Sequence, residues 1–332
     1  MSMVRWGVLS TARIGTEKVI PAIQAAQRCE VVAIASRSLQ TAQAVAADLG
    51  IPQAYGSYEA LLADAGIDAV YIPLPNHMHA EWSIAAAKAG KHVLCEKPIA
   101  LTAHEAEAMA SAAADAGVII REAFMYRFHP TWQRVKELVD AGRIGDIVAI
   151  DSWFSFHNND PNNIRNILEY GGGALMDIGC YCIHSARFVL GSEPTSVRAA
   201  IRRDPECGVD IVTSAILEFE DTKAIFGCST RAQPAQRADI VGTRGRISIE
   251  IPFNIPADRP THISLIAGGR PPAEPNTEVM EFAVRDQYTL QAEAFAAAVI
   301  EGAPLPDAGA DIVPNLRVIE RVFAAAESGG SQ

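Results

Sequence analysis

The segment His92-Val93-Leu94-Cys95-Glu96-Lys97-Pro98 decides how the first half of this chain is organised. A short apolar run that stops at charged residues and a proline predicts a buried strand, with Glu96 and Lys97 at its carboxyl end. In an open α/β sheet, ligands bind in the crevice outside the carboxyl ends of the strands. Because Pro98 bars Lys97 from the helical region and permits a cis peptide bond, we expect the backbone to aim the Lys97 ammonium. The alternative is a surface lysine ahead of a helix that begins near Leu101.

Length and composition favour a globular protein of two domains. The chain has 332 residues, of which 49% are hydrophobic and 20% are charged, and this length exceeds that of one average domain. The formal net charge is −11 and the isoelectric point is near 5.2. No basic field is therefore available for a polyanion, and we expect neither nucleic acid nor an anionic membrane surface as a partner.

The cysteines and the apolar segments indicate a cytoplasmic protein. The six cysteines form no C-x-x-C pair, and several lie inside apolar runs, which suits reduced, buried thiols. The N-terminus enters a predicted strand within a few residues and has no signal-peptide core, and no run reaches the roughly 18 apolar residues that span a bilayer. We expect cytoplasmic localisation, no disulfide and no membrane segment.

The N-terminal segment has the pattern of a dinucleotide-binding unit. The predicted strand 4–9 is followed by a turn of small and polar residues and then by a helical pattern. Against the motif G-x-G-x-x-G, Ser10 and Ala12 replace the first two glycines, and only Gly15 is kept. Small side chains still let a pyrophosphate approach, and the helix N-terminus offers N–H groups. We assign to the cofactor site Ser10, Thr11, Ala12, Arg13 and Ile14.

The end of the second predicted strand indicates a preference for NADP. Strand 30–35 ends in Ser36-Arg37-Ser38, about 20 residues past the first turn, where NAD-type folds carry an acidic residue. Two hydroxyls and a guanidinium instead suit a 2′-phosphate, because arginine offers a planar, bidentate fork. As an alternative, Ser38 caps the next helix, and it can do both.

A third predicted strand, 68–74, ends at Asn76, which we expect beside the nicotinamide crevice. His77 and His79 raise the possibility of a metal site, but at i, i+2 their side chains diverge and no acidic or cysteine partner is near. We expect no metal. With a helix to Gly90, the Lys97 strand, a helix 102–116 and a strand 118–123, the pattern predicts a doubly wound parallel sheet and a first domain of residues 1–123.

The order of these motifs resembles the Gfo/Idh/MocA oxidoreductase family. The residues that carry the resemblance are Val4-Arg5-Trp6-Gly7-Val8, Ala35-Ser36-Arg37, Pro75-Asn76, His79, Ala89-Gly90-Lys91-His92-Val93 and Glu96-Lys97-Pro98. The resemblance covers nearly the entire chain, and it implies that Lys97 lies between the nicotinamide and the substrate carbon. Further cofactor contacts are assigned to His79, Glu96, Lys97 and Arg165.

The segment after residue 123 supplies candidate substrate contacts. Arg127 follows the last predicted strand of the first domain, where it could line the pocket. Farther on, three glycines at 171–173 precede a predicted helix to Leu190 that carries Asp177 and Tyr181. At i, i+4 these two side chains share one helical face. We assign Lys97, Asp177 and Tyr181 to catalysis, and the same three with Arg127 to substrate binding.

Two positions of this helix depart from the family pattern Asp-x-Gly-x-His-x-x-Asp, because Tyr181 replaces the histidine and His184 the second aspartate. The tyrosine resembles the branch with dimeric dihydrodiol dehydrogenase, NADP-dependent D-xylose dehydrogenase and glucose-fructose oxidoreductase. A tyrosine hydroxyl near an ammonium can have its pKa lowered and can pass a proton. Cys180, Cys182 and His184 could be read as three metal ligands. The i, i+2, i+4 spacing puts Cys182 on the opposite face of the helix, so we do not take them as a metal site.

The remaining chain predicts a largely antiparallel open sheet and two closing helices. Alternating runs recur between 195 and 282, and helical patterns follow at 287–301 and 311–327. We expect a second α/β domain of residues 124–332. In the resembled family the exposed face of this sheet pairs with another subunit, which implies a homodimer or a tetramer.

These observations predict an NADP-dependent oxidoreductase. Hydride would pass between the nicotinamide and a carbinol carbon of an aldose or related polyhydroxy compound, with Lys97 and Tyr181 handling the proton on its oxygen. One alternative is oxidation of trans-dihydrodiols. Another is a non-catalytic NADP-binding regulator of the same fold, against which the intact Lys97, Asp177 and Tyr181 argue.

Overall fold

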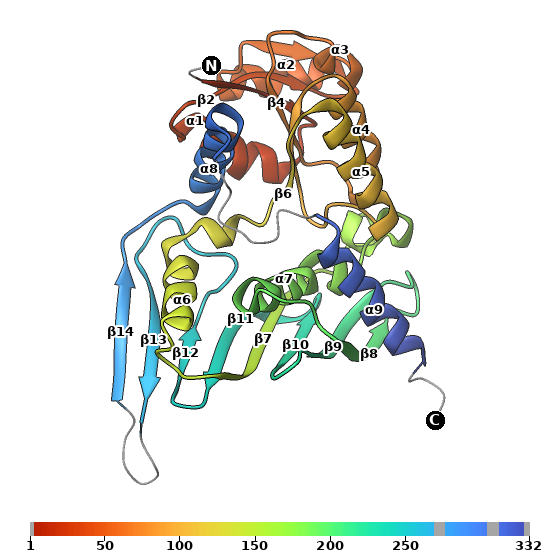
Figure 1. The fold of residues 1–332 in the computed structure, drawn as a ribbon. Coiled ribbons are helices and arrows are strands. Elements are labelled where there is room, and N and C mark those ends of the chain that lie inside the picture. Colours follow the sequence, from red (N-terminus) through yellow and green to blue (C-terminus); the bar gives the residue numbers. More distant parts are fainter. Residues whose placement is uncertain (1–2, 269–275, 304–311, 329–332) are drawn as a thin grey trace. The chain divides into compact units, whose positions relative to one another are not determined.

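A computed structural model describes residues 3–268, 276–303 and 312–328 and divides the chain into two compact units (Figure 1). Unit 1 consists of Met1–Met125 and Asp286–Val313, and unit 2 of Tyr126–Arg285 and Pro314–Gln332. The sequence prediction instead divided the chain once, at residue 123. The chain therefore leaves unit 1, builds most of unit 2, returns to unit 1 and ends in unit 2.

Unit 1 contains a parallel sheet in the order β3-β2-β1-β4-β5-β6, and all its pairings are parallel. The expected doubly wound sheet is confirmed. The sequence predicted every strand except β3, whose three residues are too few to show a pattern. The strands are β1 (Val4–Leu9), β2 (Cys29–Ala35), β3 (Gln53–Tyr55), β4 (Ala69–Ile72), β5 (His92–Cys95) and β6 (Ile120–Glu122).

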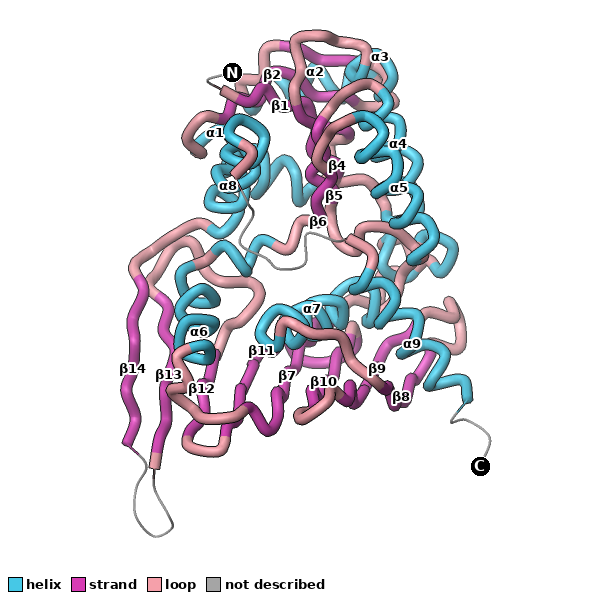
Figure 2. The backbone as a smooth tube through the Cα atoms, in the orientation of Figure 1, coloured by secondary structure: helices cyan, strands magenta, loops and turns pink. Residues whose placement is uncertain are grey.

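Helices cover both faces of this sheet, with α1 and α8 on one face and α4 and α5 on the other (Figure 2). Side-chain caps define their starts: Ser38, Ser57 and Thr102 each accept a hydrogen bond from a backbone N–H three residues later. A π-helical stretch, Gly15–Val19, precedes α1. The helices are α1 (Ile20–Ala25), α2 (Leu39–Leu49), α3 (Tyr58–Leu62), α4 (His79–Lys88), α5 (Ala103–Ala116) and α8 (Gln287–Glu301).

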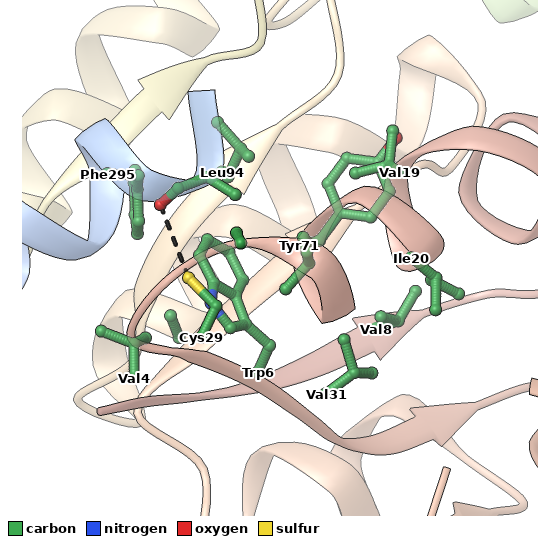
Figure 3. Packing of buried hydrophobic residues seen from close by; sticks show 14 of the residues in the cluster. Val4, Trp6, Val8, Val19, Ile20, Cys29, Val31, Tyr71, Leu94 and Phe295 are labelled. Carbon is green, nitrogen blue, oxygen red and sulfur yellow. Dashed lines mark hydrogen bonds between the residues drawn. The ribbon is translucent and has the colours of Figure 1, made fainter. Parts of the chain in front are cut away.

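The core of unit 1 explains why α8 belongs to it. Phe295 of α8 packs on Trp6 of β1 with ring centroids 5.0 Å apart, and the Cys29 thiol donates to the Ala292 carbonyl over 3.6 Å (Figure 3). Burial raises the pKa of the Cys29 thiol to about 11, so the thiol stays protonated. The apolar stripe of α8 was visible in the sequence, but the surface that it covers lies more than 260 residues away.

Unit 2 contains an eight-stranded sheet in the order β14-β13-β12-β11-β7-β10-β9-β8. Only the β7 and β10 pair is parallel, so the expected, mostly antiparallel sheet is confirmed. The strands are β7 (Ile147–His157), β8 (Ser196–Arg203), β9 (Asp210–Glu218), β10 (Lys223–Ser229), β11 (Arg231–Gly242), β12 (Gly245–Ile249), β13 (Thr261–Ala267) and β14 (Asn276–Phe282).

Three helices lie on one face of this sheet: α6 (Pro130–Asp140), α7 (Cys180–Leu190) and α9 (Pro314–Ser328) (Figure 1). The predicted start of the last helix, Asp311, lies outside the described residues. On the opposite face, Ile225, Val241 and Val279 are 41%, 37% and 60% exposed. No helix of the described residues covers this face.

In the described part of the chain, no helix combines the length and the apolar character needed to cross a membrane. All six cysteines are free thiols.

His129 caps α6 and generates a pH prediction. Its Nδ1 accepts from the Thr131 N–H over 3.2 Å, and burial lowers the pKa of the imidazole from 6.5 to about 4. Between these values the unfolded chain binds a proton that the folded chain excludes, so stability falls as the pH drops from about 6.5 to about 4. The contribution is at most about 1.4 kcal/mol per pH unit.

Asparagine keeps a capping acceptor but does not titrate. We therefore expect His129→Asn to reduce the slope of the free energy of unfolding against pH by up to about 1.4 kcal/mol per pH unit, the equivalent of one proton. Urea unfolding between pH 4.5 and 7 measures the slope. The exposed His104→Asn serves as control, and an unaltered slope in His129→Asn would contradict the assignment.

Candidate active site

Except for Arg165, which belongs to unit 2, the predicted cofactor residues lie in segments that follow strands of the parallel sheet. They come after β1, β2, β4 and β5, which are neighbours in the order β2-β1-β4-β5. Parallel neighbours end at one edge, so these turns share the carboxyl edge of the sheet. The strand order reverses between β1 and β4, which is the switch point where ligands bind in such sheets.

The turn after β1 is held in a conformation unusual for serine. Ser10 has a φ of +116°, its N–H donates to the Ala35 carbonyl over 3.0 Å, and its Oγ accepts from the Ala12 N–H over 3.2 Å. A left-handed φ at a non-glycine residue costs about 1–3 kcal/mol and clusters at functional sites. Serine therefore adopts the backbone shape that the first glycine of the motif would supply.

The helix that follows this turn begins in close contact with the segment around β4. A Cβ on Gly15 would lie 3.4 Å from the Pro73 side chain and 3.6 Å from Tyr71, so the helix runs in contact with the β4 side. Thr11 and Ala12 are half-buried, whereas Ile14 is exposed. Arg13 is exposed and pairs with Glu17 over 2.9 Å.

The turn after β2 presents a free guanidinium. Ser38 caps α2 by accepting from the Thr41 N–H over 3.3 Å, as the structural alternative predicted, and its own N–H donates to the Ser36 Oγ over 3.3 Å. Arg37 is exposed. Within the described ranges its side chain has no ion pair or hydrogen bond. A cation without a protein partner at this position fits a phosphate group.

The turn after β5 holds Lys97 by its backbone. The Glu96 N–H donates to the Ile72 carbonyl over 3.1 Å, and the Tyr71 hydroxyl donates to Glu96 Oε1 over 2.8 Å. Burial, followed by the Glu96 charge, raises the pKa of Tyr71 well above its usual value, so the phenol remains a donor. The Lys97-Pro98 peptide is cis, and Lys97 is half-buried.

His79 and Asn76 lie in the turn after β4. Asn76 is half-buried, whereas His79 is 0% exposed and both its ring nitrogens face backbone carbonyls. The contact of His79 with a cofactor stays a prediction, and the hydrogen bonds give it a role within the protein. No group of three or more side chains suited to a metal occurs in the part of the chain that the structure describes.

In unit 2, a buried carboxylate fixes the start of the helix that carries Asp177. Asp210 Oδ2 accepts from the Leu175 N–H and from the Thr213 hydroxyl, both over 2.7 Å. Gly173 has a φ of +118°, and a Cβ there would lie 2.0 Å from Asp210 Oδ1. Burial raises the pKa of Asp210. The third glycine of the 171–173 run is therefore required by both its φ and this contact.

Asp177 lies in a five-residue π-helical stretch, Leu175–Gly179, that runs into α7. Such stretches are frequent at functional sites. Arg165 Nε donates to Asp177 Oδ2 over 2.7 Å, and the Asp177 side chain is 12% exposed. Arg165, which was assigned to the cofactor, is thus brought together with a predicted catalytic residue. Its cofactor contact remains a prediction.

Tyr181 is packed among aromatic rings that the sequence did not connect with it. The rings of Tyr126, Phe154 and Phe253 lie 6.0, 5.7 and 5.4 Å from its own, and Tyr181 is 5% exposed. The aromatic character of the strand containing Phe154 was the available signal. These rings restrict how Tyr181 can turn.

Buried polar groups surround this cluster. The Tyr126 hydroxyl lies 2.5 Å from His184 Nδ1. Burial raises the pKa of Tyr126 and lowers that of His184 well below its usual value, so the phenol donates to a neutral imidazole. Arg127 is 4% exposed, with its guanidinium 4.9 Å from the Phe128 ring centroid, and its contact with substrate stays a prediction.

A doubly wound unit with a lysine at its ligand edge, joined to an α/β unit with a large open sheet, is typical of a nicotinamide-dependent oxidoreductase. Residues 4–124 match the model of an oxidoreductase family with an NAD-binding Rossmann fold, and residues 132–248 match the GFO/IDH/MocA C-terminal domain. The chain belongs to the Gfo/Idh/MocA oxidoreductase family, as its motifs predicted.

Relatives match along the whole chain. An uncharacterized oxidoreductase of Rhizobium meliloti is 44% identical over 330 residues, covering 99% of this chain and 98% of the relative. The D-xylose 1-dehydrogenase (NADP(+)) 2 of Haloferax volcanii is 42% identical and covers 98% of both chains. A crystal structure of a 3-ketoreductase from Actinomadura kijaniata with NADP and TDP-benzene has a TM-score of 0.89 at 30% identity, covering 97% of this chain and 98% of that one.

Proposed function

We propose that this protein is an NADP-dependent oxidoreductase that transfers hydride between the nicotinamide and a carbinol carbon of an aldose. The observation that carries the proposal is the position of Lys97, directly after β5 beside the switch point, in a chain that matches a D-xylose dehydrogenase over 98% of its length. The six free cysteines support a cytoplasmic setting.

The residues at the carboxyl edge of unit 1 fit a dinucleotide. Arg37, Ser36 and Ser38 would hold the 2′-phosphate, and the turn 10–14 would hold the pyrophosphate. Asn76, Glu96 and Lys97 follow β4 and β5 and would flank the nicotinamide. The nicotinamide, when bound, accepts or supplies the hydride.

The protein's own residues would handle the proton. Lys97 orients the substrate oxygen, and its positive charge favours the ionised form of a nearby phenol. Tyr181 passes the proton to or from that oxygen as general acid or base. Asp177, held by Arg165, is assigned to binding the substrate hydroxyls.

A substrate panel tests the proposal. Pentoses, hexoses and trans-dihydrodiols are each assayed by NADPH absorbance with NADP and with NAD. We expect the highest kcat/KM with an aldose. Turnover of dihydrodiols alone would support the alternative enzyme, and an absence of turnover with every compound would support a non-catalytic, cofactor-binding protein.

Arg37 should decide between the two cofactors. We expect Arg37→Ala to weaken NADP binding by about 1.5–3 kcal/mol, the range for a hydrogen bond to a charged group, and to leave NAD binding nearly unchanged. Fluorescence titration measures both affinities. Arg134→Ala, which removes a half-buried charge from α6, is the control. Equal affinities of the unmutated protein for NAD and NADP would refute the preference.

Tyr181 and Lys97 should act as one unit. Tyr181→Phe keeps the ring, so cofactor binding should survive while kcat falls by ~10²–10⁴. Lys97→Met should lower kcat at least as much, and the two losses should not add in the double variant. The control, Tyr55→Phe, also removes a hydrogen-bonded hydroxyl. Near-normal turnover of a stably folded Tyr181→Phe would overturn the assignment.

The open face of the unit 2 sheet supports a homodimer, or a tetramer built from dimers. Antiparallel sheets can face water on one side, but three exposed aliphatic side chains, Ile225, Val241 and Val279, lie on this face. We expect light scattering at micromolar concentration to give at least a dimer, and Ile225→Lys to shift it toward the monomer. Arg246→Glu on the same face tests whether charge alone has this effect. A stable monomer of the unmutated protein would contradict the proposal.

A further inference from the structure

We infer that His79 is a positioning residue for Lys97: its Nδ1–H holds the carbonyl of Pro98 against the turn that follows β4. The inference rests on the catalytic role proposed above for Lys97. It concerns a residue that is 0% exposed and therefore acts through the protein.

The geometry of His79 is that of a bridge between two backbone segments. Its Nδ1 lies 2.8 Å from the Pro98 carbonyl oxygen, and its Nε2 lies 2.7 Å from the Leu74 carbonyl oxygen. Leu74 belongs to the turn after β4, and Pro98 follows Lys97 directly. One buried ring therefore links the two turns that flank the proposed nicotinamide position.

Other hydrogen bonds fix the residues on either side of Lys97. The Glu96 N–H donates to the Ile72 carbonyl over 3.1 Å, which anchors the turn to β4. The Ile99 N–H donates over 2.9 Å to Oε1 of Glu122, a buried carboxylate in β6. His79 supplies the anchor between these two, at Pro98. Lys97 is thus carried on a backbone that three neighbouring elements hold.

This arrangement matters because catalysis depends on placement. A displacement of a reacting group by about 1 Å can cost ~10²-fold in rate. The flexible lysine side chain gains precision only if the backbone from which it starts is fixed. A purely structural His79 would instead stabilise unit 1 without affecting the chemical step.

Lys91 offers a matched control for that alternative. It is also buried, at 6% exposed, and its Nζ donates to the carbonyls of Asp64 and Ile67 over 2.7 and 2.8 Å. It lies just before β5, whereas Lys97 lies just after it. Lys91→Met thus removes two hydrogen bonds to carbonyls at the opposite edge of the same sheet.

Two substitutions separate the contacts of His79. The amide nitrogen of asparagine can take the position of Nδ1, and that of glutamine the position of Nε2. His79→Asn should keep the bond to Pro98, whereas His79→Gln should lose it and direct its amide nitrogen toward the Leu74 carbonyl instead. We expect kcat with the best sugar of the panel to fall about 10- to 100-fold in His79→Gln and by less than about threefold in His79→Asn. The Kd for NADP, measured in both variants, tests separately the cofactor contact that the sequence assigned to His79.

Thermal melts and the control complete the comparison. His79→Asn, His79→Gln and Lys91→Met should all lower Tm, and Lys91→Met should keep kcat. If kcat falls equally in the asparagine and glutamine variants, or follows Tm in all three, the inference is overturned. Lys97→Met separates this failure from failure of the proposed function, because a fully active Lys97→Met would refute the role of Lys97 itself.

A measurement on the unmutated protein needs neither substrate nor variant activity. Long-range ¹H–¹⁵N spectra of the eight ¹⁵N-labelled histidines, with His79 assigned by its loss in His79→Asn, report which ring nitrogens carry protons. Burial lowers the pKa of His79 to about 4, so at pH 7 one nitrogen is protonated. We expect that nitrogen to be Nδ1. A proton on Nε2 alone would leave Pro98 without its donor and overturn the inference.

Discussion

The parallel pairing of β2, β1, β4 and β5 is the constraint on which the nucleotide edge of unit 1 depends. Strands that run in the same direction end at the same edge, so the turns after them meet although they are far apart in the sequence. Ser10, Arg37, Asn76 and Lys97 reach one edge for this reason alone. The helical crossovers that parallel pairing requires then cover both faces of the sheet.

Buried polar side chains give these turns their shape. Asp210 in unit 2 accepts two hydrogen bonds, and His79 in unit 1 has a ring nitrogen within hydrogen-bond distance of each of two backbone carbonyls. A net hydrogen bond contributes about 0.5–1.5 kcal/mol, but a buried polar group left without one costs about 1–3 kcal/mol. The larger penalty makes alternative turn conformations unfavourable. His79 contacts Pro98, the residue after Lys97, and Asp210 contacts Leu175 at the start of the stretch that holds Asp177.

The chain returns to unit 1 because apolar side chains of its sheet need to be covered. Trp6 of β1 and Cys29 of β2 need a cover on one face, and α8 provides it through Phe295 and Ala292. Each aromatic side chain of this size buries 150–250 Å² on average, which is a large share of a domain's stabilisation. Residues 1–125 alone would leave this surface open, so the return of the chain from unit 2 to unit 1 is part of the fold.

The sequence by itself determined the elements and the class of protein. Apolar runs predicted five of the six strands of unit 1, Ser38 was readable as a helix cap, and the order of motifs up to Glu96-Lys97-Pro98 indicated the family. These features depend on local sterics, periodicity and hydrogen bonds within a few residues, all of which are visible along the chain.

Which distant residues contact each side chain was decided only by the tertiary structure. The positive φ of Ser10, the pairing of Arg165 with Asp177 and the two carbonyls at His79 involve neighbours that no local pattern names. The assignment of α8 to unit 1 is of the same kind. An amphipathic stripe predicts that a helix face is buried, and a buried polar side chain requires a hydrogen-bond partner. Which residues provide that surface or that partner depends on how distant segments pack together.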